Sequence, residues 1–326
     1  MIDSYLARFA KLSRERGGRG GKWTAVTAGG APHKPLLLLA VLDQFAEGAI
    51  TGNLVEPSDD LVDAFVLYWS RVVPPPHRGV MALPFFHLKS DSFWHLVPVP
   101  GKEAVVSSGV QLGTLTTLRD AVLGARLDDD LYSLLAVTEL RERLRAVLLH
   151  TYFSAEAQAA LTEQGTVNVE AFRYAEALFE QAKHGEKISE TAQTVYTKAA
   201  RWQGFRRLVV GAYQRQCAFC DLRVVTADGH SSVDAAHIVP FSVSRDDNPQ
   251  NGLALCRLCH WAFDEGMITV RQDLRLRTSP QLRGRGNAAG YLVDLGSKSL
   301  RLPADSSLYP GLDRLADHER DVFQKR

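Results

Sequence analysis

One stretch in the C-terminal half of the chain, residues 217–261, holds the residues that decide the local fold. It reads Cys-Ala-Phe-Cys at 217–220, Asp-Ala-Ala-His-Ile-Val-Pro at 234–240 and Asn-Gly-Leu-Ala-Leu-Cys-Arg-Leu-Cys-His-Trp at 251–261. All four cysteines of the 326-residue protein lie in it, as two Cys-x-x-Cys pairs. Such pairs offer two sulfurs each, at a spacing that suits a tetrahedral zinc site. We therefore predict a structural Zn²⁺ bound by Cys217, Cys220, Cys256 and Cys259; the alternative is a redox pair or thiols without a shared ligand.

A shell of four cysteines leaves no coordination position open, so this zinc cannot itself activate water. His237 and His260 are not needed for that shell. Residues 233–239 are typical of a strand that ends at Pro240, and residues 253–263 are typical of the start of a helix. Phosphodiester hydrolysis needs a base that activates water and a divalent ion that neutralises charge on the phosphate. A strand histidine and a helix histidine that meet at one metal would supply both.

The interleaving of His237, Asn251 and His260 with the two cysteine pairs resembles the HNH, or ββα-metal, endonucleases over residues 206–270. This resemblance implies that His237 is the general base and that Asn251 holds the loop that aims it. It also implies that His260 binds a catalytic divalent ion such as Mg²⁺ or Mn²⁺.

Many HNH enzymes place a second metal ligand directly before the base, where this chain has Ala236. Asp234 lies on the same strand face as Ala236, because strand side chains alternate with a period of two. We therefore expect Asp234 to bind the catalytic metal together with His260. Asp264, one helical turn after His260, is the other candidate, and the alternative for both carboxylates is a solvent-facing position.

The N-terminal half contains a second informative pair of segments. Residues 32–40, Pro-His-Lys-Pro-Leu-Leu-Leu-Leu-Ala, predict a buried helix, because the run is apolar on nearly all faces and Pro35 suits a first helical position. Together with Leu-Pro-Phe-Phe-His-Leu at 83–88 and Phe-Trp at 93–94, they resemble the sulfur-binding domain of modification-dependent restriction endonucleases. The resemblance spans residues 1–155. It implies recognition of phosphorothioate DNA by a domain that, in this family, is often followed by an HNH domain.

A sulfur that replaces a phosphate oxygen is larger and more weakly hydrated, so an apolar cup costs sulfur less than it costs oxygen. Leu83 stands where members of the family commonly have an aromatic residue. The alternative for residues 83–88 is the edge of a core strand, and for the two polar residues before the buried helix it is a surface turn. By the resemblance, the residues that line the apolar cup or interact with the negative charge of the phosphate are His33, Lys34, Leu83, Pro84 and His87.

A glycine-rich basic segment precedes the buried helix. Residues 14–22 hold four glycines and four basic residues, which predicts a loop. It is either a solvated linker or an arm that tracks phosphates.

We predict an α+β fold with two domains. Residues 1–155 form a mostly helical recognition domain with short strands, and residues 201–326 form a zinc-stapled ββα-metal (HNH) nuclease domain. Between them, residues 156–200 are rich in Ala, Glu and Gln, which favours a helical connector. Within these regions we expect helices at 2–12, 53–70, 114–122, 131–152 and 198–216, a strand at 93–97, and strands with loops at 270–302.

The whole-chain properties limit the compartment and the mode of binding. The net charge is +1, so contact with nucleic acid must rest on local basic patches. The longest apolar run, 35–42, is far shorter than the roughly 20 residues of a spanning helix, and the N-terminus lacks the pattern of a signal peptide. Closely paired cysteines also differ from a secreted disulfide framework. These features predict a cytoplasmic protein without a membrane segment.

These observations predict a type IV restriction endonuclease, which recognises phosphorothioate-modified double-stranded DNA and hydrolyses its phosphodiester bonds by a metal-dependent HNH mechanism. One alternative is an HNH endonuclease that reads another mark, such as a methylated base, or plain sequence. Another is a non-catalytic, zinc-stapled DNA-binding protein. A duplex cut needs two strand scissions, which favours a homodimer, although no coiled-coil heptad indicates one.

Overall fold

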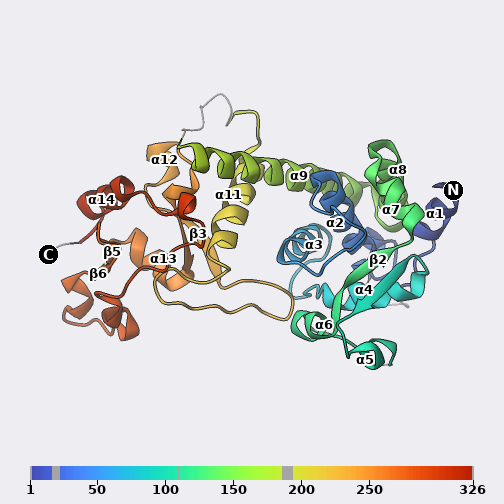
Figure 1. Cartoon of the computed structure of the whole chain (residues 1–326), viewed down its shortest axis with the longest axis horizontal. Helices are drawn as coiled ribbons and strands as arrows, with labels where there is room; N and C mark the ends of the chain where they lie inside the picture. The colour runs from blue at the N-terminus through green and yellow to red at the C-terminus, as the bar shows by residue number, and fades with distance from the viewer. Residues whose placement is uncertain (1, 17–22, 109, 186–193, 325–326) are drawn as a thin grey trace. The chain divides into compact units, whose positions relative to one another are not determined.

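The computed structural model describes residues 2–16, 23–108, 110–185 and 194–324, which are mostly helical with short strands (Figure 1). The chain divides into two compact units. The first comprises Met1–Val169 with Thr226–His230, and the second comprises Glu170–Val225 with Ser231–Arg326. The boundary falls within one long helix, α9 (Ala155–His184).

The first unit is built mainly of helices; its described residues include one antiparallel two-stranded sheet, in which Trp94 lies opposite Leu127. Its elements before α9 are α1 (Ile2–Phe9), η1 (Ala25–Thr27), α2 (His33–Glu47), α3 (Asp59–Val72), α4 (Ala82–His87), η2 (Leu88–Asp91), β1 (Trp94–Pro98), α5 (Glu103–Ser107), α6 (Leu115–Ala121), β2 (Val122–Leu127), α7 (Asp129–Ala136) and α8 (Thr138–Tyr152).

Helix α2 is the centre of the first unit. Residues 36–42 are at most 2% exposed, as expected for a helix that is apolar all round, and α2 packs against α3, α4 and α8. Near its C-terminal end the buried carboxylate of Asp43 pairs with Arg145 at 2.9 Å. The same carboxylate accepts hydrogen bonds from Tyr68 and Asn168, each at 2.7 Å. These contacts fix α2, and with it the position of its N-terminus.

The second unit contains two further two-stranded antiparallel sheets among the described residues. Its elements after α9 are α11 (Lys198–Ala212), β3 (Val233–His237), α12 (Phe241–Ser244), η3 (Pro249–Asn251), β4 (Gly252–Cys256), α13 (Arg257–Asp264), β5 (Ile268–Val270), β6 (Leu276–Thr278), η4 (Pro280–Arg283), η5 (Gly290–Leu295), η6 (Ser306–Leu308) and α14 (Leu312–Asp321).

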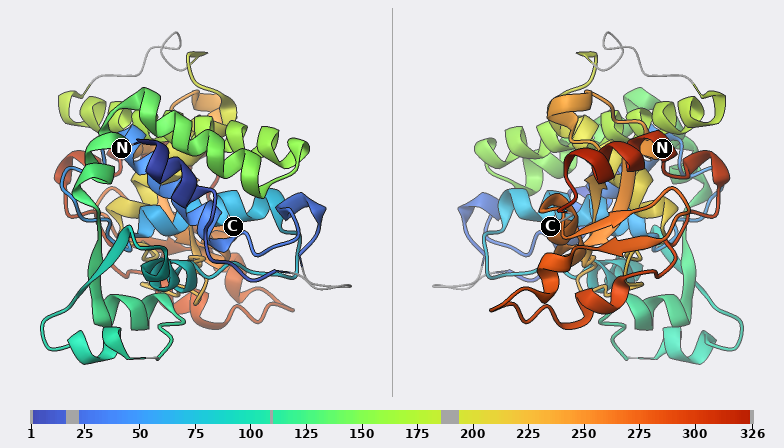
Figure 2. Two further views of the ribbon diagram at one scale, coloured as in Figure 1. Left: turned by 90° about the vertical axis from the view of Figure 1, so that its right-hand side faces the viewer. Right: turned by 90° about the vertical axis from the view of Figure 1, so that its left-hand side faces the viewer.

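The core of the second unit joins α11, the β3–β4 sheet and α13. Phe205 and Val209 of α11 are buried there, and the ring of Phe219 packs edge-on against Phe263 of α13. Helix α14, red in Figure 2, packs against β5. Its buried His318 stacks on Phe263 with ring centroids 3.6 Å apart.

The α+β fold with two compact parts agrees with the sequence-based expectation, and several elements need correction. Residues 83–88 are not a strand edge, because 82–87 form helix α4. The helix expected to run to residue 122 ends at Ala121, where β2 begins. Helices α7 and α8 replace one long helix over 131–152, since Val137 takes an extended backbone conformation between them.

Residues 253–256, expected to start a helix, belong to β4 instead, and the helix begins at Arg257. The reason is pairing with a distant segment: all five residues of β4 lie opposite β3. A short apolar run such as Leu-Ala-Leu fits a buried strand as well as a buried helix, and the long-range partner decides.

None of the helices in the described residues combines the length and the apolar character that crossing a membrane requires.

Candidate functional site

In the second unit, β3, β4 and α13 bring the residues of the Cys–His stretch together. Strand β3 pairs antiparallel with β4 so that His237 lies opposite Gly252, and α13 follows β4 directly. A side chain at Gly252 would place its Cβ 2.6 Å from Val209, so glycine lets α11 pack closely on this hairpin. The sequence therefore builds a β-β-α arrangement with His237 at the end of one strand and His260 on the helix.

The four cysteines converge on one point. Their sulfur atoms all lie within 4.8 Å of one another, and three of the four residues are buried. The sulfurs of Cys220 and Cys256 are 3.7 Å apart. A tetrahedral site with metal–sulfur bonds of about 2.3 Å places its sulfurs about 3.8 Å apart. The cysteines are thus placed to bind one metal ion.

Asn251 is completely buried and holds the loop that follows His237. Its side-chain oxygen accepts from the backbone N–H of Val239 at 2.9 Å. Its amide nitrogen donates to the backbone carbonyls of Val239 and Asp246, each at 3.0 Å. A buried carboxamide with this many backbone bonds fixes both ends of the loop between β3 and η3.

The ring of His237 is held by two neighbours. It stacks on Phe205 with centroids 4.1 Å apart and planes inclined by 4°. Its Nε2 atom lies 2.9 Å from Oδ1 of Asp247. Asp247 belongs to no motif that was recognisable in the sequence; its one available signal was a carboxylate in the short segment between His237 and Asn251.

His260 points away from the buried face of α13 and remains 30% exposed. Its Nε2 lies 3.5 Å from a carboxylate oxygen of Asp264, one turn later. Burial raises the pKa of Asp264, and the His260 charge opposes that rise. Asp234, the other expected ligand, accepts a hydrogen bond from Arg206 Nε at 2.9 Å.

In the first unit, the residues expected to bind modified DNA share one cavity. His33 and Lys34 begin α2, whereas Leu83, Pro84 and His87 belong to α4. The cavity has a volume of about 400 Å³. Among the described residues, its lining is formed by Ser13, Arg14, Glu15, Ala31, His33, Lys34, Leu83, Pro84, His87, Ser90 and Gln111.

Lys34 is buried in the wall of this cavity and already has an anionic partner. Its ammonium group lies 2.5 Å from Asp91 and 3.0 Å from the hydroxyl of Ser90. Asp91 also accepts a hydrogen bond from the backbone N–H of Ser13 at 2.8 Å. Lys34 therefore ties α2 to the residues that follow α4, and most of its charge is neutralised locally.

The two histidines of the cavity have different surroundings. The His33 ring packs against both Trp23 and Trp69, with centroid distances of 5.3 and 4.6 Å. The Nε2 atom of His87 is 3.2 Å from the Gln111 amide. Burial, followed by the positive charges of Lys34 and Lys89, lowers the pKa of His87. His87 is thus held toward its neutral form.

Arg14 was expected only as part of a basic loop, and it lines the cavity. Its guanidinium lies over the ring of Tyr152 at 4.6 Å and donates to the carbonyl of Thr27 at 3.0 Å. A side chain at Gly30 would collide with this guanidinium, with Cβ only 2.7 Å from Cζ. Residues 17–22 of the predicted arm lie outside the described residues.

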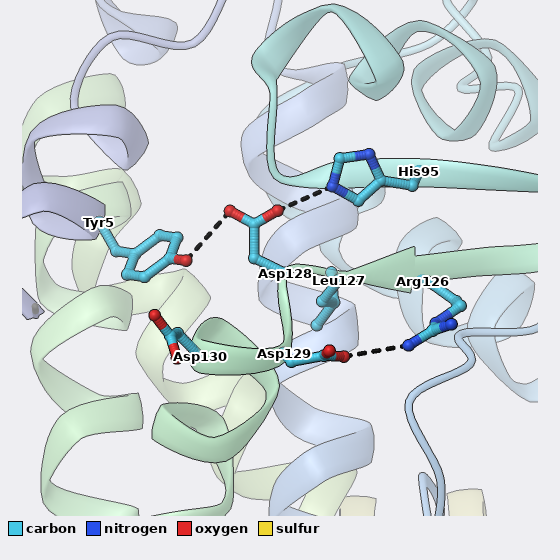
Figure 3. Close-up of a pocket in the computed structure, with 7 residues that line it drawn as sticks. All are labelled: Tyr5, His95, Arg126, Leu127, Asp128, Asp129 and Asp130. Atoms are coloured by element: carbon cyan, nitrogen blue, oxygen red, sulfur yellow. Dashed lines mark hydrogen bonds and ion pairs between the residues drawn. The ribbon is translucent and has the colours of Figure 1, made fainter.

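A second cavity of the first unit, of about 570 Å³, is acidic (Figure 3). Asp128 accepts a hydrogen bond from the Tyr5 hydroxyl at 3.0 Å and shares another with the His95 ring at 2.7 Å. Asp129 forms an ion pair with Arg126 at 3.0 Å. Burial opposes ionisation of Asp128, but hydrogen bonds from His95 and Tyr5 outweigh it and lower its pKa. The clustered carboxylates would repel a phosphate, so the cavity beside α2 is the better candidate for DNA.

Two known protein families match separate parts of the chain. Residues 22–167 match the family described as "ScoMcrA-like, DNA sulfur-binding domain", and residues 217–271 match the family described as "HNH endonuclease". The chain pairs a DNA sulfur-binding domain with an HNH endonuclease domain. The cavity residues expected from sequence lie within the sulfur-binding domain, and the four cysteines with His237, Asn251 and His260 lie within the HNH domain.

Among solved structures, the chain is similar to one titled "Modification dependent TagI restriction endonuclease", with 21% identity and a TM-score of 0.31. The likeness covers 42% of this chain and 44% of that chain, so it spans less than half of that relative. No curated protein sequence matches the chain.

Proposed function

We propose that this protein is a type IV restriction endonuclease that recognises phosphorothioate-modified double-stranded DNA and hydrolyses it by a metal-dependent HNH mechanism. The observation that carries the proposal is the presence of a DNA sulfur-binding domain and an HNH endonuclease domain in one chain. In this proposal residues 1–155 recognise the mark, residues 156–200 connect, and residues 201–326 cut.

The cavity beside α2 has the chemistry that sulfur recognition requires. Leu83, Pro84 and Ala31 offer an apolar surface, which costs a weakly hydrated sulfur less than it costs a phosphate oxygen. His87, held toward its neutral form, adds no charge that would favour oxygen. We assign sulfur contact to Leu83, Pro84 and His87.

The charge of the modified phosphate would be met at the N-terminus of α2. The first N–H groups of a helix have no partner within it and attract anions. His33 stands at this point, and Lys34 contributes from the wall although Asp91 holds its ammonium group. Arg14, on the cavity lining, adds a further cation.

We assign the cysteine site to a structural Zn²⁺. Four sulfur donors at tetrahedral spacing suit zinc, and the closed shell gives it no part in hydrolysis. Its ligands come from the loop after α11, the last residue of β4 and the first turn of α13, so bound zinc would hold these segments together.

In the HNH domain, His237 is the candidate general base and Asn251 the residue that fixes its loop. A base at the end of β3, with its ring stacked on Phe205, is held in one orientation. His237 would take a proton from the water that attacks phosphorus. The hydrogen bonds of Asn251 to Val239 and Asp246 support the second assignment.

We place the catalytic divalent ion, Mg²⁺ or Mn²⁺, at His260 together with an aspartate. Asp234 is the ligand expected from sequence, although Arg206 binds its carboxylate; Asp264 lies beside His260 itself. An imidazole with one or two carboxylates fits such an ion. When bound, the ion would neutralise charge on the phosphate.

The proposal further places the protein in the cytoplasm and gives it a homodimeric state for cutting. Free cysteines gathered for metal binding fit a reducing compartment. Two copies would supply the two strand scissions of a duplex cut.

The test uses the full-length protein with two duplexes of the same sequence, one of which carries a phosphorothioate. With Mg²⁺ or Mn²⁺ we expect cleavage of the modified duplex only, and no cleavage by His237→Ala, which should still bind both zinc and modified DNA. Equal cleavage of the two duplexes would replace sulfur recognition with another mark or plain sequence. Binding of modified DNA without any cleavage would support the non-catalytic alternative.

A further inference from the structure

Asp247 occupies a position that a solvent-exposed loop carboxylate would not have. It lies between α12 and η3 and is only 5% exposed. Its Oδ1 atom is 2.9 Å from Nε2 of His237, and its Oδ2 atom accepts a hydrogen bond from Tyr174 at 2.8 Å. Each carboxylate oxygen thus has its own partner, which prevents rotation of the group.

The groups around this pair complete its electrostatic surroundings. Arg201 of α11 lies 3.8 Å from Oδ2, and its guanidinium also covers the ring of Phe241 at 4.8 Å. Burial, and then the charge of Asp247, raise the pKa of Tyr174 far above its usual value, so its phenol stays neutral and donates. Asp247 thus faces a hydrogen-bond donor and a positive charge on the side away from His237.

An ionised carboxylate only accepts hydrogen bonds, so Nε2 of His237 must carry the proton in their contact. In a neutral imidazole the other nitrogen, Nδ1, then holds the lone pair. Stacking on Phe205 fixes the plane of the ring, and Asp247 fixes its rotation within that plane.

We infer that Asp247 is a positioning residue for His237, holding it in the tautomer whose Nδ1 is the base. The inference rests on the proposed nuclease function. In the step it serves, Nδ1 takes a proton from water while the water oxygen forms a bond to phosphorus. The bond from phosphorus to the leaving sugar oxygen breaks, and that oxygen keeps the electron pair and takes a proton from solvent. Asp247 stabilises the imidazolium that forms.

The structure suggests an informative variant, Asp247→Asn. Tyr174 donates to Oδ2 and the positive guanidinium of Arg201 lies 3.8 Å from it, so the new carboxamide would turn its oxygen to them. Its NH₂ group would then face Nε2 of His237. His237 would then have to accept a hydrogen bond at Nε2 and carry its own proton on Nδ1. The histidine would remain, but its Nδ1 could no longer act as the base.

We expect Asp247→Asn to lower kcat by about 10²- to 10⁴-fold, since a catalytic histidine held in the wrong tautomer loses proton transfer. KM and zinc content should change little. Tyr174→Phe, which loosens Asp247 but keeps its charge, should give a smaller loss. The matched control is Glu319→Gln, a carboxylate paired with Arg277 at 2.8 Å in the same unit, which should keep wild-type kcat.

The tautomer can be measured without substrate. In the ¹⁵N spectrum of the full-length wild-type protein at neutral pH, His237 should be protonated on Nε2, and in Asp247→Asn on Nδ1. A wild-type His237 protonated on Nδ1 overturns the inference, even if the variant does not fold. A wild-type kcat in Asp247→Asn also overturns it. Failure of the wild-type protein to cut any DNA refutes the proposed nuclease instead, while the spectrum still decides the tautomer.

Discussion

Leu83 is the residue at which sulfur recognition can be separated from general DNA binding. It offers apolar surface to the cavity and carries no charge, so its contribution should depend on whether sulfur or oxygen enters. Leu83→Ser should reduce the preference for the modified duplex by about fivefold, as expected for loss of about 1 kcal/mol of apolar contact. Competition binding with the His237→Ala background measures this ratio.

The matched control is Leu123→Ser, at a residue of β2 that is 49% exposed and does not line the cavity. It should leave the preference unchanged. A Leu83→Ser protein that weakens binding of both duplexes equally would argue against direct contact between Leu83 and sulfur.

At the scale of single residues, the spacing of the two Cys-x-x-Cys pairs predicts a shared metal site, and the four sulfurs do lie together. The five cavity residues were expected from a family resemblance, and they do line one cavity. The partners of those residues carry no such pattern. Asp247 meets His237 and Asp91 meets Lys34 because the chain folds back, and an isolated aspartate in a loop resembles any solvated carboxylate.

At the scale of elements, α13 carries ligands for both proposed metals on different faces. Cys259 is buried, whereas His260, the next residue, is 30% exposed. We expect Cys259→Ser to lose zinc and lower the melting temperature. His260→Ala should keep zinc and lose at least about 10²-fold in cleavage, because charge on the phosphate is no longer neutralised. Metal analysis, thermal melting and cleavage assays distinguish these outcomes.

Leu258→Ala, on the exposed face of the same helix, is the control for zinc content and folding. Loss of zinc from His260→Ala would contradict the separation of the two metal sites.

Helix α14 makes the second unit sensitive to acid through His318. Burial lowers the pKa of His318 to about 4, while Thr269 and the carbonyl of Phe263 bond to its two nitrogens. At a pH below about 6.5, the ordinary pKa of histidine, the unfolded chain binds a proton at His318, whereas the folded chain leaves this side chain neutral until the pH approaches 4. Stability should therefore fall as pH drops from about 6.5 to about 4, by up to about 3 kcal/mol in total.

Urea unfolding at a series of pH values tests this slope. His318→Gln should be less stable at neutral pH but should lose less stability on acidification. Acid release of zinc affects both proteins, so the difference between them at each pH isolates His318. His184→Gln, at an exposed histidine of α9, is the control and should follow the wild-type curve. Parallel curves for wild type and His318→Gln would refute the prediction.

Helices and strands could be predicted from sequence where the local residue pattern alone determines the secondary structure. The apolar run of α2 and the periodic pattern of α3 produce helices on their own account. Strands β2 and β4 were missed because each depends on a partner distant in sequence: β2 pairs with β1, and β4 with β3. A local pattern cannot contain that pairing energy.

At the scale of the whole molecule, a net charge of +1 has a consequence for discrimination. Non-specific DNA binding comes almost entirely from phosphate contacts that release counterions, so it weakens steeply with salt. Apolar contact between sulfur and the α2 cavity releases no counterion, so its contribution to binding should change little with salt concentration. Because the protein has no large global charge to hold unmodified DNA, increasing salt should weaken binding of unmodified DNA more than binding of modified DNA.

We therefore expect the ratio of modified to unmodified cleavage to rise when the salt concentration increases from about 50 to about 200 mM. Initial rates on a mixture of the two duplexes, with distinguishable labels and a fixed divalent ion concentration, measure this ratio directly. The Leu83→Ser protein is the internal comparison, because weaker sulfur contact should make its ratio lower at every salt concentration. A ratio that stays constant would mean that modified and unmodified DNA are bound through the same phosphate contacts, and that selectivity arises in the cutting step.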